Sequence, residues 1–162
     1  MQILASHFFN YALISITTKT CYINNFSHAL ISAIANRFIL TRLKHNEIIT
    51  CMHEALMNSI LHGNLNLKSN FTDKEGFYSY QDKVSHLLKI TYYRNKRIYI
   101  KVWNNSEYLR FSIQDEGDGF EIPDFTINNA FPKGRGLMFI NSLADEMRLG
   151  DDNKTLYMTF RH

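Results

Sequence analysis

The spacing of apolar and polar residues predicts helices before and after a group of strands. Apolar side chains recur at helical spacing over residues 26–42 and again over 46–63, and a third helix is expected over 136–147. Segments that are rich in β-branched residues or alternate in polarity predict strands, which cover residues 11–19, 87–93, 97–103, 108–114 and 155–160.

The connections between these elements indicate how they are arranged. Short turns at 94–96 and 104–106 favour an antiparallel meander. The polar stretch 64–83 is expected to be a long loop or a small irregular insert, and 118–133 is expected to be a flexible loop. We therefore predict an α+β, two-layer sandwich in which helices cover one face of a mixed, mostly antiparallel sheet. In this prediction residues 1–162 form a single domain with an insert at about 64–86.

Composition narrows the function classes. The chain has 162 residues, of which 45% are hydrophobic, and this suits one domain with a real core. A formal net charge of +3 is too small to indicate nucleic-acid binding. Neither a leader peptide nor an apolar stretch long enough to cross a bilayer is recognisable. Cys21 and Cys51 do not form a disulfide framework, so we expect a reduced, cytoplasmic setting without nucleic-acid or membrane partners.

The helix expected over 46–63 carries two polar residues on one face. Glu54 and Asn58 lie roughly 40° apart on a helical wheel, opposite an apolar stripe that contains Ile48, Met52, Ala55, Leu56, Ser59 and Ile60. An amide oxygen suits Mg²⁺, and a carboxylate one turn earlier could accept a proton near a terminal phosphate. The alternative is a solvated helix face. A zinc-protease motif, H-E-x-x-H, is excluded because Met57 stands in place of its second histidine. His62 is expected to support the helix end or to contact phosphate.

A carboxylate followed by glycines ends the strand expected over 108–114. Asp115 could accept a hydrogen bond from an exocyclic amine such as that of adenine, and Gly117 and Gly119 would let a flat ligand approach the backbone. The alternative is an ordinary turn, since Asp118 and Gly119 form a common turn pair. Thr155 could hydrogen-bond a ligand through its hydroxyl or serve only as a strand-forming residue.

The last candidate site is the start of the helix expected over 136–147. Free backbone N–H groups at a helix start bind anions, and the glycines in Gly134-Arg135-Gly136-Leu137 would let a phosphate come close. Lys133 and Arg135 add positive charge. The alternative is a loop with two solvated basic residues.

Two common nucleotide-binding signatures are absent. The phosphate-loop pattern G-x-x-x-x-G-K-[ST] does not occur, and the dinucleotide fingerprint fails because Ile122 stands where its third glycine would be. No Ser-His-Asp or Cys-His signature is recognisable. What remains is three short stretches in a fixed order, residues 53–64, 115–120 and 134–137, and each is a weak signal by itself.

These stretches resemble the N, G1 and G2 boxes of the Bergerat-fold ATP-binding superfamily, which includes gyrase-type topoisomerases, Hsp90-type chaperones, histidine kinases and mismatch-repair MutL proteins. In size and boxes the chain looks most like the branch of serine/threonine kinases that are anti-sigma factors. Residues 53–63 are similar to that branch's E-A-x-x-N-x-x-x-H-G run, and 136–147 are similar to its G-L-x-x-I and L-x-D-E-V runs. The segment 64–88 is longer than that branch usually needs.

The resemblance implies a role for each candidate residue. Glu54 would be the general base, and Asn58 the Mg²⁺ ligand. Asp115 would bind the adenine amine in a pocket shaped by Gly117 and Gly119, and Thr155 would support it. Residues 121–133 would form a lid over the phosphates of ATP, which contact the glycine-framed helix start, namely Lys133, Gly134, Arg135, Gly136 and Leu137.

It also implies a function. The expected protein is a regulatory, Mg·ATP-binding serine/threonine protein kinase that phosphorylates a small antagonist protein and sequesters a sigma factor or another regulator. A homodimer is compatible with the resemblance. Two alternatives stay open: an ATP-binding switch module without turnover, and a detached ATP-binding half of a two-component histidine kinase.

Overall fold

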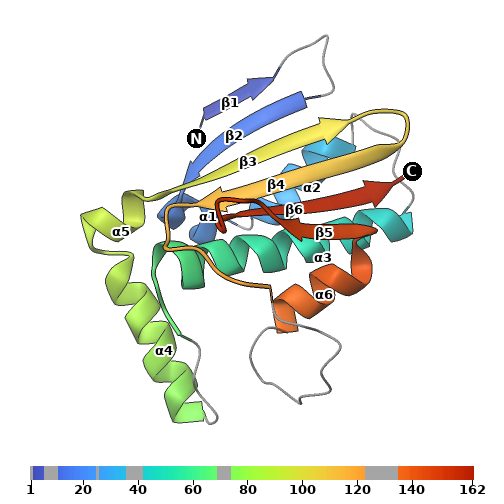
Figure 1. Ribbon diagram of the computed structural model, residues 1–162. Coiled ribbons are helices and arrows are strands. Elements are labelled where there is room, and N and C mark those ends of the chain that lie inside the picture. Colours follow the sequence, from blue (N-terminus) through green and yellow to red (C-terminus); the bar gives the residue numbers. More distant parts are fainter. Residues whose placement is uncertain (1, 6–10, 25, 36–41, 69–73, 123–134) are drawn as a thin grey trace.

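The computed structural model describes residues 2–5, 11–24, 26–35, 42–68, 74–122 and 135–162. Within these ranges, six strands form one antiparallel sheet in the order β1-β2-β3-β4-β6-β5 (Figure 1). The strands are β1 (Gln2–Ala5), β2 (Tyr11–Thr17), β3 (Arg97–Asn104), β4 (Tyr108–Asp115), β5 (Glu146–Leu149) and β6 (Thr155–Arg161). Because β6 lies between β4 and β5, the last strand of the chain is in the interior of the sheet.

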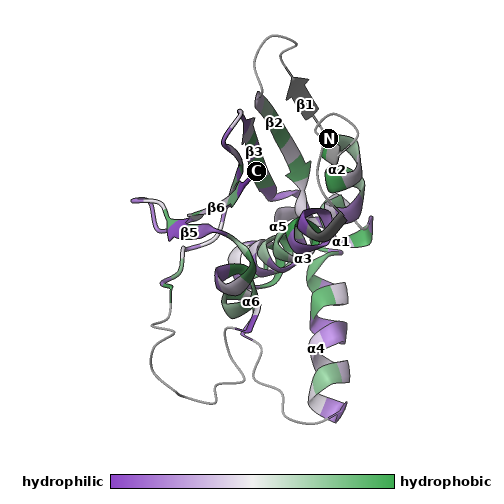
Figure 2. Cartoon of the chain, turned by 90° about the vertical axis from the view of Figure 1, so that its right-hand side faces the viewer, coloured by the Kyte–Doolittle hydropathy of each residue, from purple (hydrophilic) through white to green (hydrophobic). Residues whose placement is uncertain are grey.

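The helices lie mainly on one side of this sheet, and they form the second layer. They are α1 (Thr18–Ile23), α2 (Phe26–Ala35), α3 (Arg42–Asn58), the π-helix η1 (Ser59–Asn64), α4 (Lys74–Leu87), α5 (Thr91–Asn95) and α6 (Arg135–Leu143). Figure 2 shows the layers from the side, with α3 and α6 next to the sheet and α4 leading away from both. None of the described helices is long and apolar enough to span a membrane.

Alternating burial along the strands creates the core between the layers. In β3, Ile98, Ile100 and Val102 are buried, while the residues between them are at least partly exposed. The buried faces of the strands and of the helices together form one hydrophobic cluster. The apolar residues of the stripe expected on α3 and η1 belong to it, namely Ile48, Met52, Ala55, Leu56 and Ile60, and Ser59 is also buried. The predicted α+β, two-layer fold is confirmed, and every described strand pairing is antiparallel.

The predictions for residues 64–83 and 87–93 do not agree with the structure. The strand expected over 87–93 does not form, because α4 ends at Leu87 and α5 covers Thr91–Asn95. The second half of the polar stretch 64–83 is not an irregular loop either, since α4 begins at Lys74. Tyr80 and Val84, one helical turn apart, are the buried residues of α4. With only this narrow stripe buried, a mostly solvated helix looks like a loop in the sequence.

Several boundaries also differ from those expected. The strand expected over 11–19 ends at Thr17, because the Thr17 side chain caps α1 by accepting a hydrogen bond from the Thr20 N–H. The helix expected over 136–147 ends at Leu143, and Met147 lies in β5, paired with Met158. The short strands β1 and β5 were not predicted. With four residues each, they are too short to show a period in the sequence.

Candidate functional site

Three segments that are distant in the sequence line one cavity of about 330 Å³. They are the end of α3 with η1, the end of β4 with the turn after it, and the start of α6, and Leu156 of β6 completes the lining. This volume lies at the lower end of the range for small-molecule sites. The residues that line the cavity are Ala55, Asn58, Ser59, His62, Gly63, Ile113, Asp115, Gly119, Phe120, Glu121, Arg135, Gly136, Leu137 and Leu156.

Glu54 and Asn58 lie against the start of α6. A Cβ atom built on Gly136 would be 2.6 Å from Glu54 Oε2 and 3.2 Å from Asn58 Nδ2. Both polar side chains therefore occupy the space that a side chain at position 136 would need. The expected pair of polar residues on one helix face is present, and it faces the glycine-framed helix start.

Asp115 is the buried carboxylate of the cavity, with only 8% of its surface exposed. Its Oδ1 accepts a hydrogen bond from the Gly117 N–H at 2.8 Å, and the Ser59 hydroxyl donates to the same carboxylate. Burial raises the pKa of Asp115 above its usual value, and the Gly117 and Ser59 hydrogen bonds offset part of that rise. A carboxylate in this setting gains from a hydrogen-bond donor on a bound ligand.

Close backbone contact between η1 and the turn after β4 sets the position of Asp115. A Cβ on Gly63 would overlap the Asp115 carboxylate, and a Cβ on Gly117 would lie 2.6 Å from the Gly63 oxygen. Gly119 has a φ of +93°, which side chains rarely allow. Gly63 and Gly117 are thus required where the helix end meets the turn, and Gly119 is required by the conformation of the turn itself.

His62 joins the cavity to the end of η1. Its Nδ1 lies 2.6 Å from the Leu67 carbonyl oxygen, which can only accept, so this nitrogen donates the hydrogen bond. The same side chain lines the cavity. The imidazole therefore stabilises the end of the helix, which is one of the two roles that the sequence suggested for His62.

Comparison with known families shows the family of the chain. A family model described as the histidine kinase-like ATPase domain matches residues 18–160, which is most of the chain. The chain belongs to the histidine kinase-like ATPase family. No curated protein matches it. Membership of an ATPase family implies that the protein binds ATP.

The candidate ATP-site residues are brought together in part. Asn58, Asp115, Gly119, Arg135, Gly136 and Leu137 line the cavity, while Glu54 and Gly117 contact residues that do. Lys133 and Gly134 lie outside the described residues, as does nearly all of the expected lid. Thr155 is not among the lining residues, and its hydroxyl donates to Asp152 Oδ2 at 2.6 Å. This bond and the backbone N–H groups of Asp152, Lys154 and Thr155 hold the pKa of Asp152 below its usual range.

Sequence reasoning missed the apolar side of the cavity and part of its polar side. Ile113, Phe120 and Leu156 line it and offer a non-polar wall to a flat base. Ser59 was placed on the buried face of the helix, where it is, but its bond to Asp115 gave no sequence signal.

A bound metal would have few protein ligands in this candidate ATP site. Among the described residues, no group of three or more His, Cys, Asp or Glu side chains could hold a metal ion. Mg²⁺ fits this donor set, because it commonly takes one or two protein oxygens and completes its shell with phosphate and water. The Asn58 side chain, beside Gly136, would supply one such oxygen.

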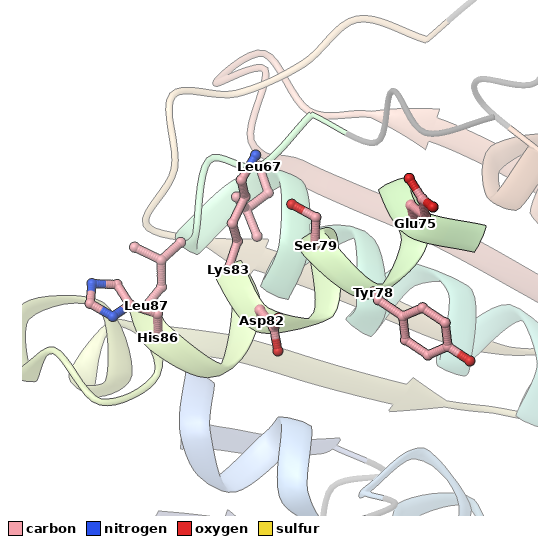
Figure 3. Close-up of a pocket in the computed structure, with 8 residues that line it drawn as sticks. All are labelled: Leu67, Glu75, Tyr78, Ser79, Asp82, Lys83, His86 and Leu87. Atoms are coloured by element: carbon pink, nitrogen blue, oxygen red, sulfur yellow. The ribbon is translucent and has the colours of Figure 1, made fainter. Parts of the chain in front are cut away.

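A larger hollow of about 790 Å³ lies elsewhere, along α4 (Figure 3). Apart from Leu67, its lining comes from one helix, and it includes Tyr78, Asp82 and Lys83. None of the three sequence boxes contributes to it. The smaller cavity is therefore the candidate ATP site.

Proposed function

We propose that this chain is a Mg·ATP-dependent serine/threonine protein kinase of the anti-sigma-factor type. It would phosphorylate a small antagonist protein and, when that antagonist is scarce, sequester a sigma factor or another regulator. The observation that carries the proposal is the convergence of Glu54 and Asn58 on Gly136, at the start of α6. A carboxylate and a metal-binding amide then stand together where an anion-binding helix begins.

The base-binding end of the proposed site rests on Asp115. An exocyclic amine of adenine would donate to the buried carboxylate, which already holds the Gly117 N–H and the Ser59 hydroxyl. A purine with an oxygen at that position would meet a carboxylate that repels it. Ile113 and Leu156, which line the same cavity, would contact the faces of the base.

The phosphate-binding end rests on Asn58 and on the first turn of α6. Free N–H groups there and the Arg135 guanidinium would hold the phosphates. A bound Mg²⁺ ion, with the Asn58 side-chain oxygen as a ligand, would supply neutralisation of phosphate charge.

Glu54 is the proposed general base. Its carboxylate is half-buried, and it would accept the proton of the serine or threonine hydroxyl as that oxygen bonds to the γ-phosphorus. The bond between the γ-phosphorus and the bridging oxygen breaks, and ADP leaves with that oxygen. The chain therefore contributes positioning and one proton acceptor, and it forms no covalent intermediate.

The test is transfer of label from γ-labelled Mg·ATP to proteins of a cell extract, with wild-type protein and Glu54→Gln. Because the amide cannot accept the proton, label transfer should fall by at least ~100-fold while ATP affinity stays within a few-fold. Asn46→Ala, an exposed substitution on α3 away from the cavity, is the control.

The outcomes separate the three functions. Label in a serine or threonine of a target protein, lost with Glu54→Gln, supports the kinase. ATP binding without any transfer contradicts it and favours the switch module. Acid-labile label on a histidine contradicts it and favours the histidine kinase half.

A further inference from the structure

Asn64 is a fully buried polar residue next to the ATP site, with an exposed fraction of 0%. Its Nδ2 donates to Thr18 Oγ1 at 2.8 Å and to the Arg97 carbonyl oxygen at 3.1 Å. Its Oδ1 accepts from the Glu116 N–H at 2.8 Å. One amide thus connects η1 to α1, to β3 and to the turn after β4. A buried amide with this many partners is costly to replace.

The Glu116 N–H is the important partner, because it lies between Asp115 and Gly117. The Gly117 N–H donates to the Asp115 carboxylate, and the Glu116 N–H between these two residues donates to Asn64 Oδ1. Gly63, the neighbour of Asn64, touches both the Asp115 carboxylate and the Gly117 backbone. The orientation of the Asp115 carboxylate therefore depends on bonds that Asn64 makes, although Asn64 does not line the cavity.

The π-helical form of η1 explains how Asn64 reaches this position. A π-helix bonds residues five apart, as the Leu65 N–H does to the Ile60 oxygen at 2.9 Å. This spacing puts Ser59 and Asn64 on the same side of η1. Ser59 then reaches the Asp115 carboxylate, and Asn64 reaches the next peptide unit. In a regular α-helix these two side chains would point to different sides.

We propose that Asn64 is a positioning residue for nucleobase selection: it holds the Glu116 N–H and thereby fixes the Asp115 carboxylate for an exocyclic amine. This inference rests on the proposed ATP site, with Asp115 at the base. Loss of the Glu116 contact frees the turn, and the carboxylate then loses its fixed orientation. Affinity for the amine-bearing base falls, while affinity for the triphosphate, held at the other end of the cavity, is kept.

The experiment measures the dissociation constants of Mg·ATP, Mg·ITP and inorganic tripolyphosphate by calorimetry. Inosine carries an oxygen in place of the amine, so the ratio of the ITP and ATP constants reports base selection alone. We expect wild-type protein to favour ATP. In Asn64→Ala this ratio should fall ~10-fold, equivalent to about 1.4 kcal/mol, with tripolyphosphate affinity unchanged within ~2-fold.

Two further variants separate positioning from stability. Thr18→Val removes one partner of the Asn64 amide but keeps the Glu116 contact, so it should lower the melting temperature and leave the ratio unchanged. Asn64→Asp keeps an oxygen that accepts the Glu116 N–H but loses the donors, so it should be less stable and still select ATP. Thermal melts establish that each variant is folded, and Asn64→Ser replaces Asn64→Ala if the latter is unfolded.

The inference is overturned if folded Asn64→Ala keeps the wild-type ratio, if Thr18→Val loses as much selectivity, or if Asn64→Asp behaves like Asn64→Ala. If one of these results is found while wild-type protein still prefers ATP, the inference fails and the proposed function is still supported. Wild-type protein that binds neither nucleotide overturns the proposed function and this inference together.

Discussion

At the scale of single residues, the surroundings of a side chain decide whether it is available to a ligand. Asp115 and Thr155 both looked like ligand contacts in the sequence. Asp115 is buried at the cavity and keeps hydrogen-bonding capacity for a donor. The Thr155 hydroxyl instead donates to Asp152, three residues earlier in the turn between β5 and β6. The two residue types are equally plausible in a sequence motif, and only their contacts distinguish them.

Burial of Asp115 gives the proposed ATP binding a pH dependence. Since burial raises the pKa of this carboxyl, its protonation begins at a higher pH than for an ordinary aspartate. The protonated form cannot make the charge-assisted bond to the amine, so ATP affinity should fall as the pH drops toward that raised pKa. Asp115→Asn should weaken ATP binding by at least ~10-fold and remove this dependence. Calorimetric titrations over roughly pH 5 to 8, the range in which proteins tend to be most stable, measure both effects.

The same pKa shift affects stability with the opposite sign. The folded protein holds the Asp115 proton more tightly than the unfolded chain does, so this residue's contribution to stability falls as the pH rises through the window between the two pKa values. Asp115→Asn should therefore flatten the pH dependence of the unfolding free energy in that window. An equally steep dependence in the variant would contradict the assignment.

At the scale of elements, the site depends on how closely α6 approaches α3. Gly136 sits in the first turn of α6, with Glu54 and Asn58 in the space where its Cβ would be. Lys44, near the start of α3, bonds Asp145 just after α6 at 3.0 Å, so the two helices are also joined at the far end. The Lys44–Asp145 bond and the close contact at Gly136 thus hold α3 and α6, the two sides of the proposed phosphate site, together.

Gly136→Ala should separate activity from stability. Alanine favours a helix over glycine by about 1 kcal/mol, which supports α6, but its Cβ would displace the Glu54 carboxylate and the Asn58 amide. We expect a melting temperature no more than slightly changed, together with a loss of phosphoryl transfer of at least ~10-fold. Asn141→Ala, on the exposed side of the same helix, is the matched control. Full transfer activity in Gly136→Ala would show that Glu54 and Asn58 need not stay against the α6 start.

At the scale of the whole molecule, a site built from three distant segments should couple ligand binding to global stability. A ligand that bridges α3, the β4 turn and α6 binds only the folded chain, so it raises the unfolding free energy by mass action. At 100 times the dissociation constant, this is about 2.7 kcal/mol, or a rise in melting temperature of roughly 5–10 °C for a domain of this size.

A thermal melt with increasing Mg·ATP measures this coupling, and ITP at the same concentrations is the control. The rise should shrink strongly for ITP and for Asp115→Asn. Equal rises with both nucleotides in wild-type protein would contradict base recognition by Asp115.

The sequence by itself determined the layers and the sheet interior. Regular alternation in β3 and the apolar stripe of α3 follow from burial of one face, and burial leaves a period in the sequence. The three boxes likewise could be recognised because backbone contact requires glycine, as at Gly63 and Gly117.

Tertiary structure alone decided the rest. The π-helical turn that aligns Ser59 with Asn64 and the short strands β1 and β5 depend on contacts with other segments of the chain. The partner of the Thr155 hydroxyl depends on a local hydrogen bond that competes with several others. A solvated helix such as α4 buries too little to leave a period that stands out. Local pattern records which face of an element is buried, because burial selects residue types; it does not record which neighbour covers that face, because many apolar or polar partners satisfy the same residue.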